Sequence, residues 1–454
     1  MLEFINRYLT GIAVPALLIP SGIFFSFRLG FFWLRHPVAV LRPLLSGKPR
    51  TPGGTSPRRA LCLALAGTLG VGNVVGVSAA IYMGGAGAVF WMWISALAAS
   101  ALKYAETVLA LRHRVTDSGR LRGGAPYYIR DVGTAAGLKS AGKAVAGIFA
   151  FLCLVNSLSM GCVVQVNAVS GALFGVLDIA PWLTGAVFAV LSAVSVSGGL
   201  SRISRITSAL VPFMSVGFFL MSAAVLIIRA DAIPGVIRLV ITDAFDFDRG
   251  SGFFGGVCGF LLSRSLRYGT MRGLITNEAG AGTSPLAHAS SDGEPAEQGF
   301  LGIAEVTVDT VILCAMTAAV ILVGYDTVSV WGDNSVMMTV SAYSSVLGKG
   351  AEGAVCVAVL LFGVAAVICQ SFYALESLSF LLPRAPQSTL RRILAPAFAV
   401  CSLIGALSSP GSVWGIADLS MGLMTLINVV CLLAARKEVV DETRRYFIKI
   451  GKKR

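Results

Sequence analysis

The residues of this chain whose types could do chemistry are polar side chains scattered among apolar and glycine-rich stretches. Asn73 lies within GTLGVGNVVG (67–76), Gln165 within VVQVNAVSG (163–171), and Glu305 and Asp309 are four residues apart in a later apolar stretch. No nucleophile stands beside a base in these stretches. Residues of these types indicate binding of a small polar or charged ligand, without covalent chemistry.

Sequence motifs of enzymes are absent. The chain has only three histidines (His36, His113 and His288), and it contains no HExxH, Walker, GxSxG or kinase-type motif. Its nine cysteines form no CxxC pair, and we interpret them as small apolar side chains in helices. The sequence predicts a protein that is not an enzyme and has no cofactor beyond a coupling ion.

The elements that carry these residues are predicted to lie in a membrane. Of 454 residues, 56% are hydrophobic and 13% are charged, against about 25% charged in soluble domains. The net charge of +13 does not indicate nucleic-acid binding, because the basic residues lie between apolar stretches. Lipid is the solvent that suits so apolar a chain.

Eleven apolar segments are long enough, or nearly so, to cross a bilayer. They lie at 8–28, 60–83, 85–111, 143–173, 182–198, 206–229, 251–284, 299–324, 351–382, 393–408 and 411–435. Lysine and arginine gather in alternate connections, at 28–59, 112–143, 199–205, 383–392 and 436–454. The positive-inside rule then predicts a multi-pass protein of the bacterial inner (plasma) membrane, with its N-terminus outside and its C-terminus in the cytoplasm.

Two of these segments are poor continuous helices. Glycine costs about 1 kcal/mol against alanine in a helix, and glycines crowd Gly67–Gly76 and Ser265–Pro285. With the first span set aside, these are the first and sixth of ten helices, the pattern of a five-plus-five inverted-repeat transporter. Unwound backbone in a membrane lines a cavity, and its free helix ends attract the two charges of a zwitterion. The alternative is that the glycines serve close helix packing.

Long motifs of this chain resemble one known family. They include GTLGVGNVVGVSAAIYMGGAGAVFWMWISALAASALKYAET (67–107), SGGLSRISRITSALVPFM (197–214), YGTMRGLITNEAGAGTSPLAHAS (268–290) and WGIADLSMGLMTLIN (414–428). They are similar to the alanine or glycine:cation symporters, from about residue 60 onward. The resemblance implies an all-α fold of LeuT type and uptake of alanine, glycine or D-alanine driven by Na+ or H+.

The domain organisation follows from the spans and the resemblance. We expect an extra N-terminal helix and basic loop at 1–59, a transporter core at 60–435 and a basic tail at 436–454. The core would comprise one repeat at 60–229 and a second at 251–435. The expected partners are a small neutral amino acid and membrane lipid, with the chain a monomer or a loose homo-oligomer.

The resemblance also implies a substrate site between the two broken helices. By analogy, the substrate-binding residues are Leu69, Gly70, Asn73, Cys162, Gln165, Tyr268, Gly269, Ala366 and Gln370. Within this set, Gln165 would meet the ammonium or carboxylate group of the amino acid.

The chain departs from the family pattern in its eighth core helix. Ala365 and Ala366 stand where the family has hydroxyl residues, and Gln370 stands where it has tryptophan. Alanine side chains cannot bind a hard cation, which prefers oxygen ligands. The expected Na+ site is therefore a weakened one, made from backbone around Gly67, Gly70, Ala365 and Ala366. This departure supports an alternative function, a cation-independent facilitator or exchanger of small amino acids.

Charges inside the spans should have partners, because each costs at least about 2.5 kcal/mol at the membrane centre. Lys103 and Glu106 share a helix face and are expected to form a structural ion pair, with a proton relay as the alternative. Glu305 and Asp309 are expected to pair with Arg272 or Arg267, or else to steer cations.

Four polar residues leave alternatives open. Gln165 and Asn167 are two apart, so one should face the cavity and the other a neighbouring helix. Arg264 would either replace part of a bound cation's charge or lie solvated in a water-filled vestibule. Glu278, in TNEAG, is expected to cap a helix or lock an inner gate.

Overall fold

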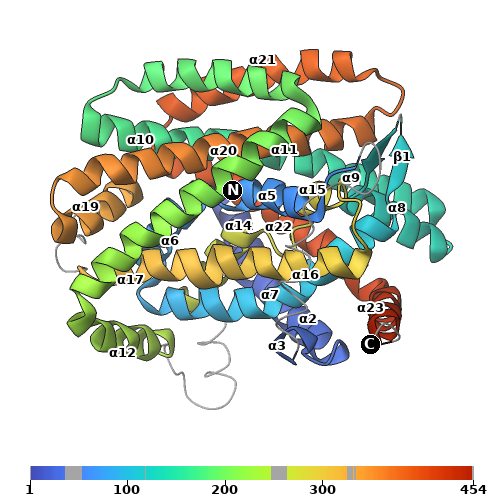
Figure 1. Cartoon of the computed structure of the whole chain (residues 1–454), viewed down its shortest axis with the longest axis horizontal. Helices are drawn as coiled ribbons and strands as arrows, with labels where there is room; N and C mark the ends of the chain where they lie inside the picture. The colour runs from blue at the N-terminus through green and yellow to red at the C-terminus, as the bar shows by residue number, and fades with distance from the viewer. Residues whose placement is uncertain are drawn as a thin grey trace.

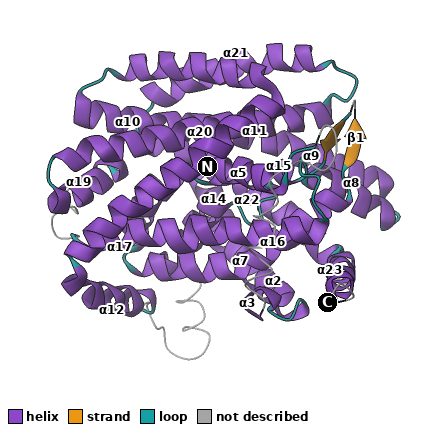
Figure 2. Ribbon diagram, in the orientation of Figure 1, coloured by secondary structure: helices purple, strands orange, loops and turns teal. Residues whose placement is uncertain are grey.

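The computed structural model describes residues 2–35, 54–117, 119–246, 263–324, 331 and 334–451 of this chain, and these are almost entirely helical (Figures 1 and 2). The α-helices are α1 (Leu2–Tyr8), α2 (Val14–Arg28), α3 (Phe32–Arg35), α5 (Pro57–Thr68), α6 (Val75–Gly84), α7 (Gly87–Arg112), α8 (Ala125–Ala135), α9 (Lys139–Leu158), α10 (Gln165–Leu177), α11 (Pro181–Ile228), α12 (Ile233–Ala244), α14 (Arg264–Asn277), α15 (Pro285–His288), α16 (Pro295–Val306), α17 (Ala315–Val323), α19 (Ser335–Leu347), α20 (Gly350–Leu381), α21 (Gln387–Leu407), α22 (Pro410–Ala434) and α23 (Arg436–Gly451). Short 3-10 helices occupy Val71–Asn73 and Ala230–Ala232, and π-helical segments occupy Leu9–Ala13, Ser159–Val164 and Thr307–Cys314. Strands β1 (Val115–Asp117) and β2 (Arg120–Arg122) form an antiparallel hairpin, with Thr116 opposite Leu121.

Length and composition make eight of the described helical segments candidates for crossing a membrane. They are Phe4–Arg28, Gly87–Arg112, Lys139–Leu177, Pro181–Ile228, Pro295–Val323, Gly350–Leu381, Gln387–Leu407 and Val413–Ala434. Large apolar side chains face outward from them: Phe213 is 71% exposed and Ile227 is 75% exposed. Lipid is the solvent that would accept such surfaces, so the membrane assignment agrees with the fold.

The helix α11 joins two predicted spans, 182–198 and 206–229, through a bend at Gly199. Gly199 has φ +70°, a backbone conformation that glycine adopts without steric cost. Part of the predicted 251–284 span, residues 251–262, lies outside the described residues. The count of eleven spans and the five-plus-five repeat therefore stay predictions.

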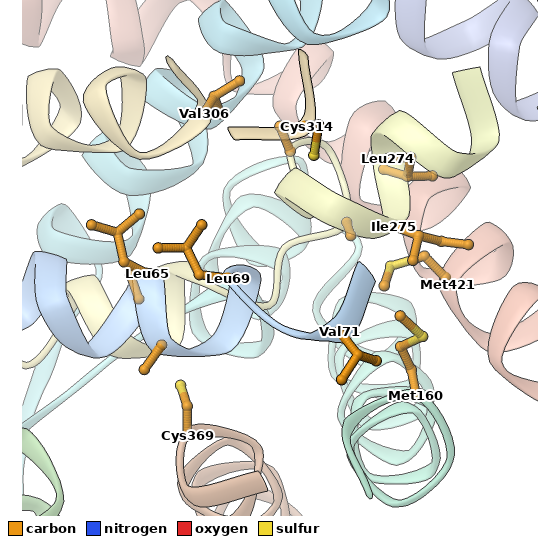
Figure 3. Packing of buried hydrophobic residues seen from close by; sticks show 14 of the residues in the cluster. Leu65, Leu69, Val71, Met160, Leu274, Ile275, Val306, Cys314, Cys369 and Met421 are labelled. Atoms are coloured by element: carbon orange, nitrogen blue, oxygen red, sulfur yellow. The ribbon is translucent and has the colours of Figure 1, made fainter. Parts of the chain in front are cut away.

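The first glycine-rich stretch breaks a helix, as the sequence predicts. The helix α5 ends at Thr68, Leu69 has ψ +66°, and Gly70 is extended. One 3-10 turn at Val71–Asn73 follows before α6 resumes the helical course. Figure 3 shows the ribbon of α5 giving way after Leu69 to extended chain that leads to Val71.

The second glycine-rich stretch also breaks a helix. The helix α14 ends at Asn277, and Glu278 follows it with φ +51°. Gly280 and Gly282 then turn the chain with φ of +93° and +80°, in the left-handed region that favours glycine. The predicted interruption is confirmed for the first stretch; in the second, Gly269 and Gly273 lie inside α14, and the chain leaves the helix only at Glu278.

The two broken helices lie in the middle of the helical packing. The helix α14 packs along α7 and α6, and α5 packs against α11 and α20. The side chains around both breaks, including Leu69, Val71 and Leu274, belong to one buried apolar cluster (Figure 3). Polar groups at the breaks are therefore shielded from solvent and depend on one another for hydrogen bonds.

Candidate functional site

The break in the first core helix is held by Gln165, at the start of α10. Its Oε1 accepts a hydrogen bond from the backbone N–H of Val71 at 2.9 Å, and its Nε2 donates to the carbonyl of Met160 at 3.2 Å. A Cβ atom on Gly70 would lie 2.7 Å from Gln165 Oε1. Glycine at position 70 therefore allows the amide side chain to reach the unwound backbone.

Asn73 and Asp309 form a second polar group at the same break. Asn73 Nδ2 donates to Asp309 Oδ1 at 2.6 Å, and Thr310 Oγ1 donates to Asp309 Oδ2 at 2.8 Å. Thr276 Oγ1 lies 3.1 Å from Thr310 Oγ1, and Asn277 Nδ2 donates to the same hydroxyl. The group joins the first broken helix, the end of α14 and the π-helical segment Thr307–Cys314.

Three features mark the Asn73–Asp309 group as a candidate cation site. Both side chains are fully buried, and Asn73 Oδ1 has no hydrogen-bond partner. Within the described ranges, no lysine, arginine or histidine nitrogen within 4.0 Å forms an ion pair with Asp309. A buried carboxylate needs a counter-charge or a proton, and carboxylate, amide and hydroxyl oxygens are the ligands that a hard cation prefers.

Two π-helical segments position the polar residues that contact the first break, Gln165 and the Asp309 group. The π-helical segment Ser159–Val164 ends directly before Gln165, and the segment Thr307–Cys314 contains Asp309 and Thr310. A π turn interrupts regular helical hydrogen bonding and is often found at functional sites. Here it places these side chains against the unwound backbone.

The end of α14 contacts α20 through Glu278. Gln370 Nε2 donates to Glu278 Oε1 at 3.0 Å, and the Thr283 hydroxyl donates to Glu278 Oε2. Gln370 also packs against Gly161, where a Cβ atom would approach it to 2.5 Å. Gln370 thus joins the second break to the π-helical segment before Gln165.

Lys103 on α7 lies in a buried network of hydrogen bonds and ion pairs with Ser284 and Glu305. Its Nζ donates to Ser284 Oγ at 2.6 Å and pairs with Glu305 Oε1 at 3.3 Å, and His288 Nε2 lies 2.8 Å from Glu305 Oε2. Glu106 instead accepts a hydrogen bond from Asn428. The predicted Lys103–Glu106 pair is therefore wrong, because Glu305 reaches Lys103 from another helix.

The predicted pairing of Glu305 or Asp309 with an α14 arginine is also wrong. Arg272 Nη1 lies 3.6 Å from Asp418 Oδ1, and its guanidinium stacks 4.2 Å from the ring centre of Trp414. Arg267 Nη2 donates to the hydroxyl of Tyr268 at 2.7 Å. Neither arginine therefore pairs with Glu305 or Asp309.

The predicted substrate residues do not all meet. Leu69, Gly70, Asn73 and Gln165 lie together at the first break, and all four are buried. The remaining five have other contacts: Cys162 approaches Ser402 Oγ to 3.3 Å, Gly269 packs on Ala88 and Trp91, Tyr268 lines a cavity, Gln370 binds Glu278, and Ala366 is buried in α20.

Asn167 bears on one predicted alternative. Its Nδ2 donates to the carbonyls of Gly405 and Ser408 on α21, at 2.9 and 2.7 Å, while Gln165 faces the break. The expectation that one side chain faces the cavity and the other a neighbouring helix stays a prediction, because Asn167 both bonds to the neighbouring helix and lines the cavity described below.

The surroundings of Gly67, one of the residues predicted to hold Na+, are less polar than the Asp309 group. A Cβ atom on Gly67 would lie 3.0 Å from both Cys369 Sγ and Tyr373 Oη, and Cys369 Sγ donates to the carbonyl of Leu63. Ala365 and Ala366 are fully buried in α20. The oxygen-rich group formed by Asn73, Asp309, Thr276 and Thr310 fits a cation better.

A cavity of about 690 Å³ lies between the start of α14 and the end of α6, beside the two interrupted helices. We call it the vestibule; its lining includes Val75, Ala79, Met83, Val164, Asn167, Ala168, Arg264, Arg267, Tyr268, Arg272, Asn334, Trp414 and Asp418. Arg264 is exposed there and donates to the carbonyl of Met83 through Nε at 3.0 Å and Nη2 at 2.7 Å. This agrees with the predicted alternative of a solvated arginine.

Sequence reasoning missed several residues of the site. Thr276, Asn277 and Thr310 complete the Asp309 group, and Trp414 and Asp418 partner Arg272. The one available signal was position, since Thr276 and Asn277 directly precede the broken turn and Thr310 adjoins Asp309.

Comparison with known proteins places the chain in a family. The model of the sodium:alanine symporter family matches residues 1–454. The amino-acid carrier protein AlsT of Bacillus subtilis is 34% identical over 432 residues, which cover 95% of this chain and 87% of AlsT. The sodium/alanine symporter AgcS of Methanococcus maripaludis is 30% identical over 453 residues, which cover 98% of this chain and 96% of AgcS.

A solved structure shares the fold. The outward-open, substrate-bound structure of a Na+-coupled sialic acid symporter aligns with a TM-score of 0.52 and 13% identity, over 95% of this chain and 87% of that one. The matched family comprises membrane transporters and not enzymes. The chain belongs to the sodium:alanine symporter family.

Proposed function

We propose that this protein is a secondary active symporter that takes up a small neutral amino acid, alanine or glycine and also D-alanine, driven by a Na+ gradient across the bacterial inner membrane. The observation that carries the proposal is the break at Leu69–Val74, where unwound backbone, Gln165 and the buried Asp309 group meet. The family membership of the chain supports the transport role.

The break suits a small zwitterion. Helix ends freed by the break present N–H groups to a carboxylate and carbonyl groups to an ammonium. Gln165 Oε1 already accepts the N–H of Val71, in the way that a substrate carboxylate oxygen would. Buried neighbours pack closely around Gly70 and Gly161, so the space favours a short side chain on the substrate.

The Asp309 group is our proposed coupling site. Asp309, Asn73 Oδ1 and the hydroxyls of Thr276 and Thr310 would hold Na+, which would balance the carboxylate charge in a dry surrounding. Asn73 belongs to the 3-10 turn that follows Gly70. Filling of the cation site would therefore stabilise the unwound turn that binds the amino acid.

Transport would follow from rocking of two repeats around this site. The helix α14 runs from the vestibule at Arg264 to the Asp309 group at Thr276. Below the breaks, the Lys103–Glu305 network and the Glu278–Gln370 contact close the other side. We propose that these contacts separate when the site opens toward the cytoplasm.

The test is uptake of labelled alanine into proteoliposomes, with an inward Na+ gradient or with choline in its place. We expect Na+ to accelerate uptake, and Asp309→Asn to remove that acceleration, because the variant lacks the charge that attracts the cation. Asp231→Asn is the matched control, since the Asp231 side chain is 80% exposed on the short helix before α12. Glycine, D-alanine and serine should compete with the label, and leucine should not.

Each alternative has its own result. Equal uptake in Na+ and choline, together with a response to a proton gradient that Asp309→Asn removes, would identify H+ as the coupling ion. Uptake independent of both gradients would contradict symport. It would favour the cation-independent facilitator or exchanger that Ala365 and Ala366 suggest.

A further inference from the structure

The vestibule carries an excess of positive charge. Its described lining contains three arginines, Arg264, Arg267 and Arg272, against one carboxylate, that of Asp418. Arg264, Tyr268 and Arg272 follow one another at intervals of four residues, so they form one stripe along α14. The stripe faces a cavity of about 690 Å³, which has room for a small organic anion and water.

Arg272 is the least satisfied of the three arginines. Its side chain is only 5% exposed, yet its Nε and Nη1 have no hydrogen-bond partner. Asp418 is its ion-pair partner, but the 3.6 Å from Nη1 to Oδ1 exceeds a hydrogen bond, and Asp418 Oδ1 is itself unpartnered. Buried guanidinium donors left without acceptors are costly, which indicates that an acceptor is missing.

Aromatic rings hold two of the guanidinium groups in place. Arg272 lies 4.2 Å above the ring centre of Trp414, and Arg267 lies 4.5 Å above that of Tyr268. Such stacking contacts only the face of the guanidinium plane. In Arg272 it therefore leaves Nε and Nη1 to donate two parallel bonds to a carboxylate, whereas Arg267 Nη2 donates to the Tyr268 hydroxyl.

We propose that the vestibule contains a carboxylate-binding site, separate from the break, in which Arg272 donates through Nε and Nη1 and Arg267 supplies a second positive charge. Its ligand is a small monocarboxylate. One source is the carboxylate of a transported amino acid on its way to the break. Only this source rests on the proposed function. The other source is a free organic acid that occupies the vestibule without being transported.

Position supports a role on the entry path. Arg272 precedes Thr276 by four residues, which is about 6 Å along a helix, and Thr276 belongs to the Asp309 group. A carboxylate held at Arg272 would thus lie about one helical turn from the break. Asp418 competes for the same guanidinium edge, so ligand binding would displace the weak Arg272–Asp418 pair.

The test measures binding without transport, using acetate as the probe and the purified full-length protein in detergent. Acetate should change the fluorescence of Trp414, which stacks on Arg272, and Trp414→Phe should remove that change. Arg272→Gln and Arg267→Gln should each weaken acetate binding about tenfold or more, the loss expected for a charged hydrogen bond. Asp418→Asn should strengthen it severalfold, because the competing carboxylate is gone.

Control variants and competitors distinguish three causes of a changed acetate response: loss of folding, loss of charge elsewhere in the protein, and the source of the carboxylate. Arg229→Gln removes a partly exposed arginine before α12 and should leave acetate binding unchanged. Should Arg272→Gln fail to fold, Arg267→Gln and Asp418→Asn still test the site with opposite expected signs. Alanine should displace acetate from the vestibule while alaninamide, which lacks a carboxylate, should not; displacement by acetate-like acids alone would assign the site to free organic acids.

Two results would overturn the proposal. One is an acetate response that Arg267→Gln and Asp418→Asn leave unchanged. The other is an equal response to chloride and acetate at matched ionic strength, which would show general screening of the arginines. Failure of Na+-driven uptake would leave both measurements intact, so loss of the proposed transport function and loss of this site are distinguishable.

Discussion

Gly70 shows how a single residue determines the shape of the site. A methyl group there would lie 2.7 Å from Gln165 Oε1, far inside van der Waals contact. The end of a glutamine side chain can move, so the protein should still fold. The hydrogen bond from Val71 N–H to Gln165 would be displaced instead.

We therefore expect Gly70→Ala to raise the KM for alanine uptake about tenfold, the value of one buried hydrogen bond. Radiolabelled uptake into proteoliposomes measures the KM, and thermal unfolding in detergent checks the fold. Gly217→Ala is the matched control, since no atom lies within 4 Å of its added methyl. An unchanged KM in Gly70→Ala would show that Gln165 does not order the break.

At the scale of elements, buried charge joins helices that the two breaks would otherwise leave loosely packed. Lys103 on α7 binds Glu305 on α16 and Ser284 beside α15, all fully buried. Removing one partner of such a pair is strongly destabilising, because the other charge is left uncompensated. The network is thus well placed to hold the side of the protein away from the vestibule closed.

The C-terminal helix α23 docks on the end of α7 through an ionisable cluster. His113 Nε2 lies 2.9 Å from Glu438 Oε1, and His113 Nδ1 lies 3.2 Å from Asp131 Oδ2. Arg112 pairs with both Glu438 and Glu442. Burial disfavours the charged imidazole, but the hydrogen bonds and charges of Glu438 and Asp131 outweigh it and raise the pKa of His113.

Docking of α23 should therefore depend on pH. A raised histidine pKa contributes stability that is complete below its ordinary value of about 6.5 and is lost as the pH rises through the raised value. We expect the NMR signal of the His113 ring to titrate with a midpoint above about 6.5. Assignment is direct, because the chain has only three histidines and His113→Ala removes one signal.

Glu438→Gln should lower the midpoint of His113, since it removes the carboxylate that stabilises the imidazolium. Glu442→Gln, one turn further along α23, should lower it less, because Glu442 bonds to Arg112 Nη1 at 2.8 Å and not to the imidazole. Equal titration midpoints of His113 in the wild type and in Glu438→Gln would contradict an electrostatic interaction between His113 and Glu438 of α23.

At the scale of the whole molecule, the orientation in the membrane is a prediction from the basic connections. The basic connections predicted to lie in the cytoplasm include the α23 region, whereas the vestibule opens near α6, α14 and α19. With the predicted orientation, in which α23 is cytoplasmic, we propose that the vestibule faces outward. This arrangement would let the amino acid enter from outside and meet the break from above.

Cysteine labelling tests this orientation in intact cells. Asp231→Cys should react with a membrane-impermeant maleimide, whereas Lys437→Cys should react only after the cells are permeabilised; both positions are exposed. The unmodified protein is the control, because seven of its eight described cysteines are buried and Cys401 is half-buried. Labelling of Lys437→Cys in intact cells would show that the C-terminal helix lies outside the cell, which contradicts the predicted topology.

Local composition was enough to predict a helical membrane chain and the two stretches in which the chain leaves the helix. The crowding of glycine at Gly67–Gly76 and Ser265–Pro285 predicts both interruptions, because the cost of glycine in a helix is a property of the backbone itself. The apolar outer surfaces are predictable for the same reason, since lipid selects side chains by type and not by partner. The family motifs extended this to the transport role.

Partners between helices could be determined only by the tertiary structure. Spacing along one helix predicted an ion pair between Lys103 and Glu106. In the structure Lys103 pairs instead with Glu305 on α16, which is 202 residues away in sequence. Asp309 likewise gains Asn73 from 236 residues away, and Arg272 gains Trp414 and Asp418. A buried charge binds whichever group the packing brings within reach, and sequence spacing does not encode that distance.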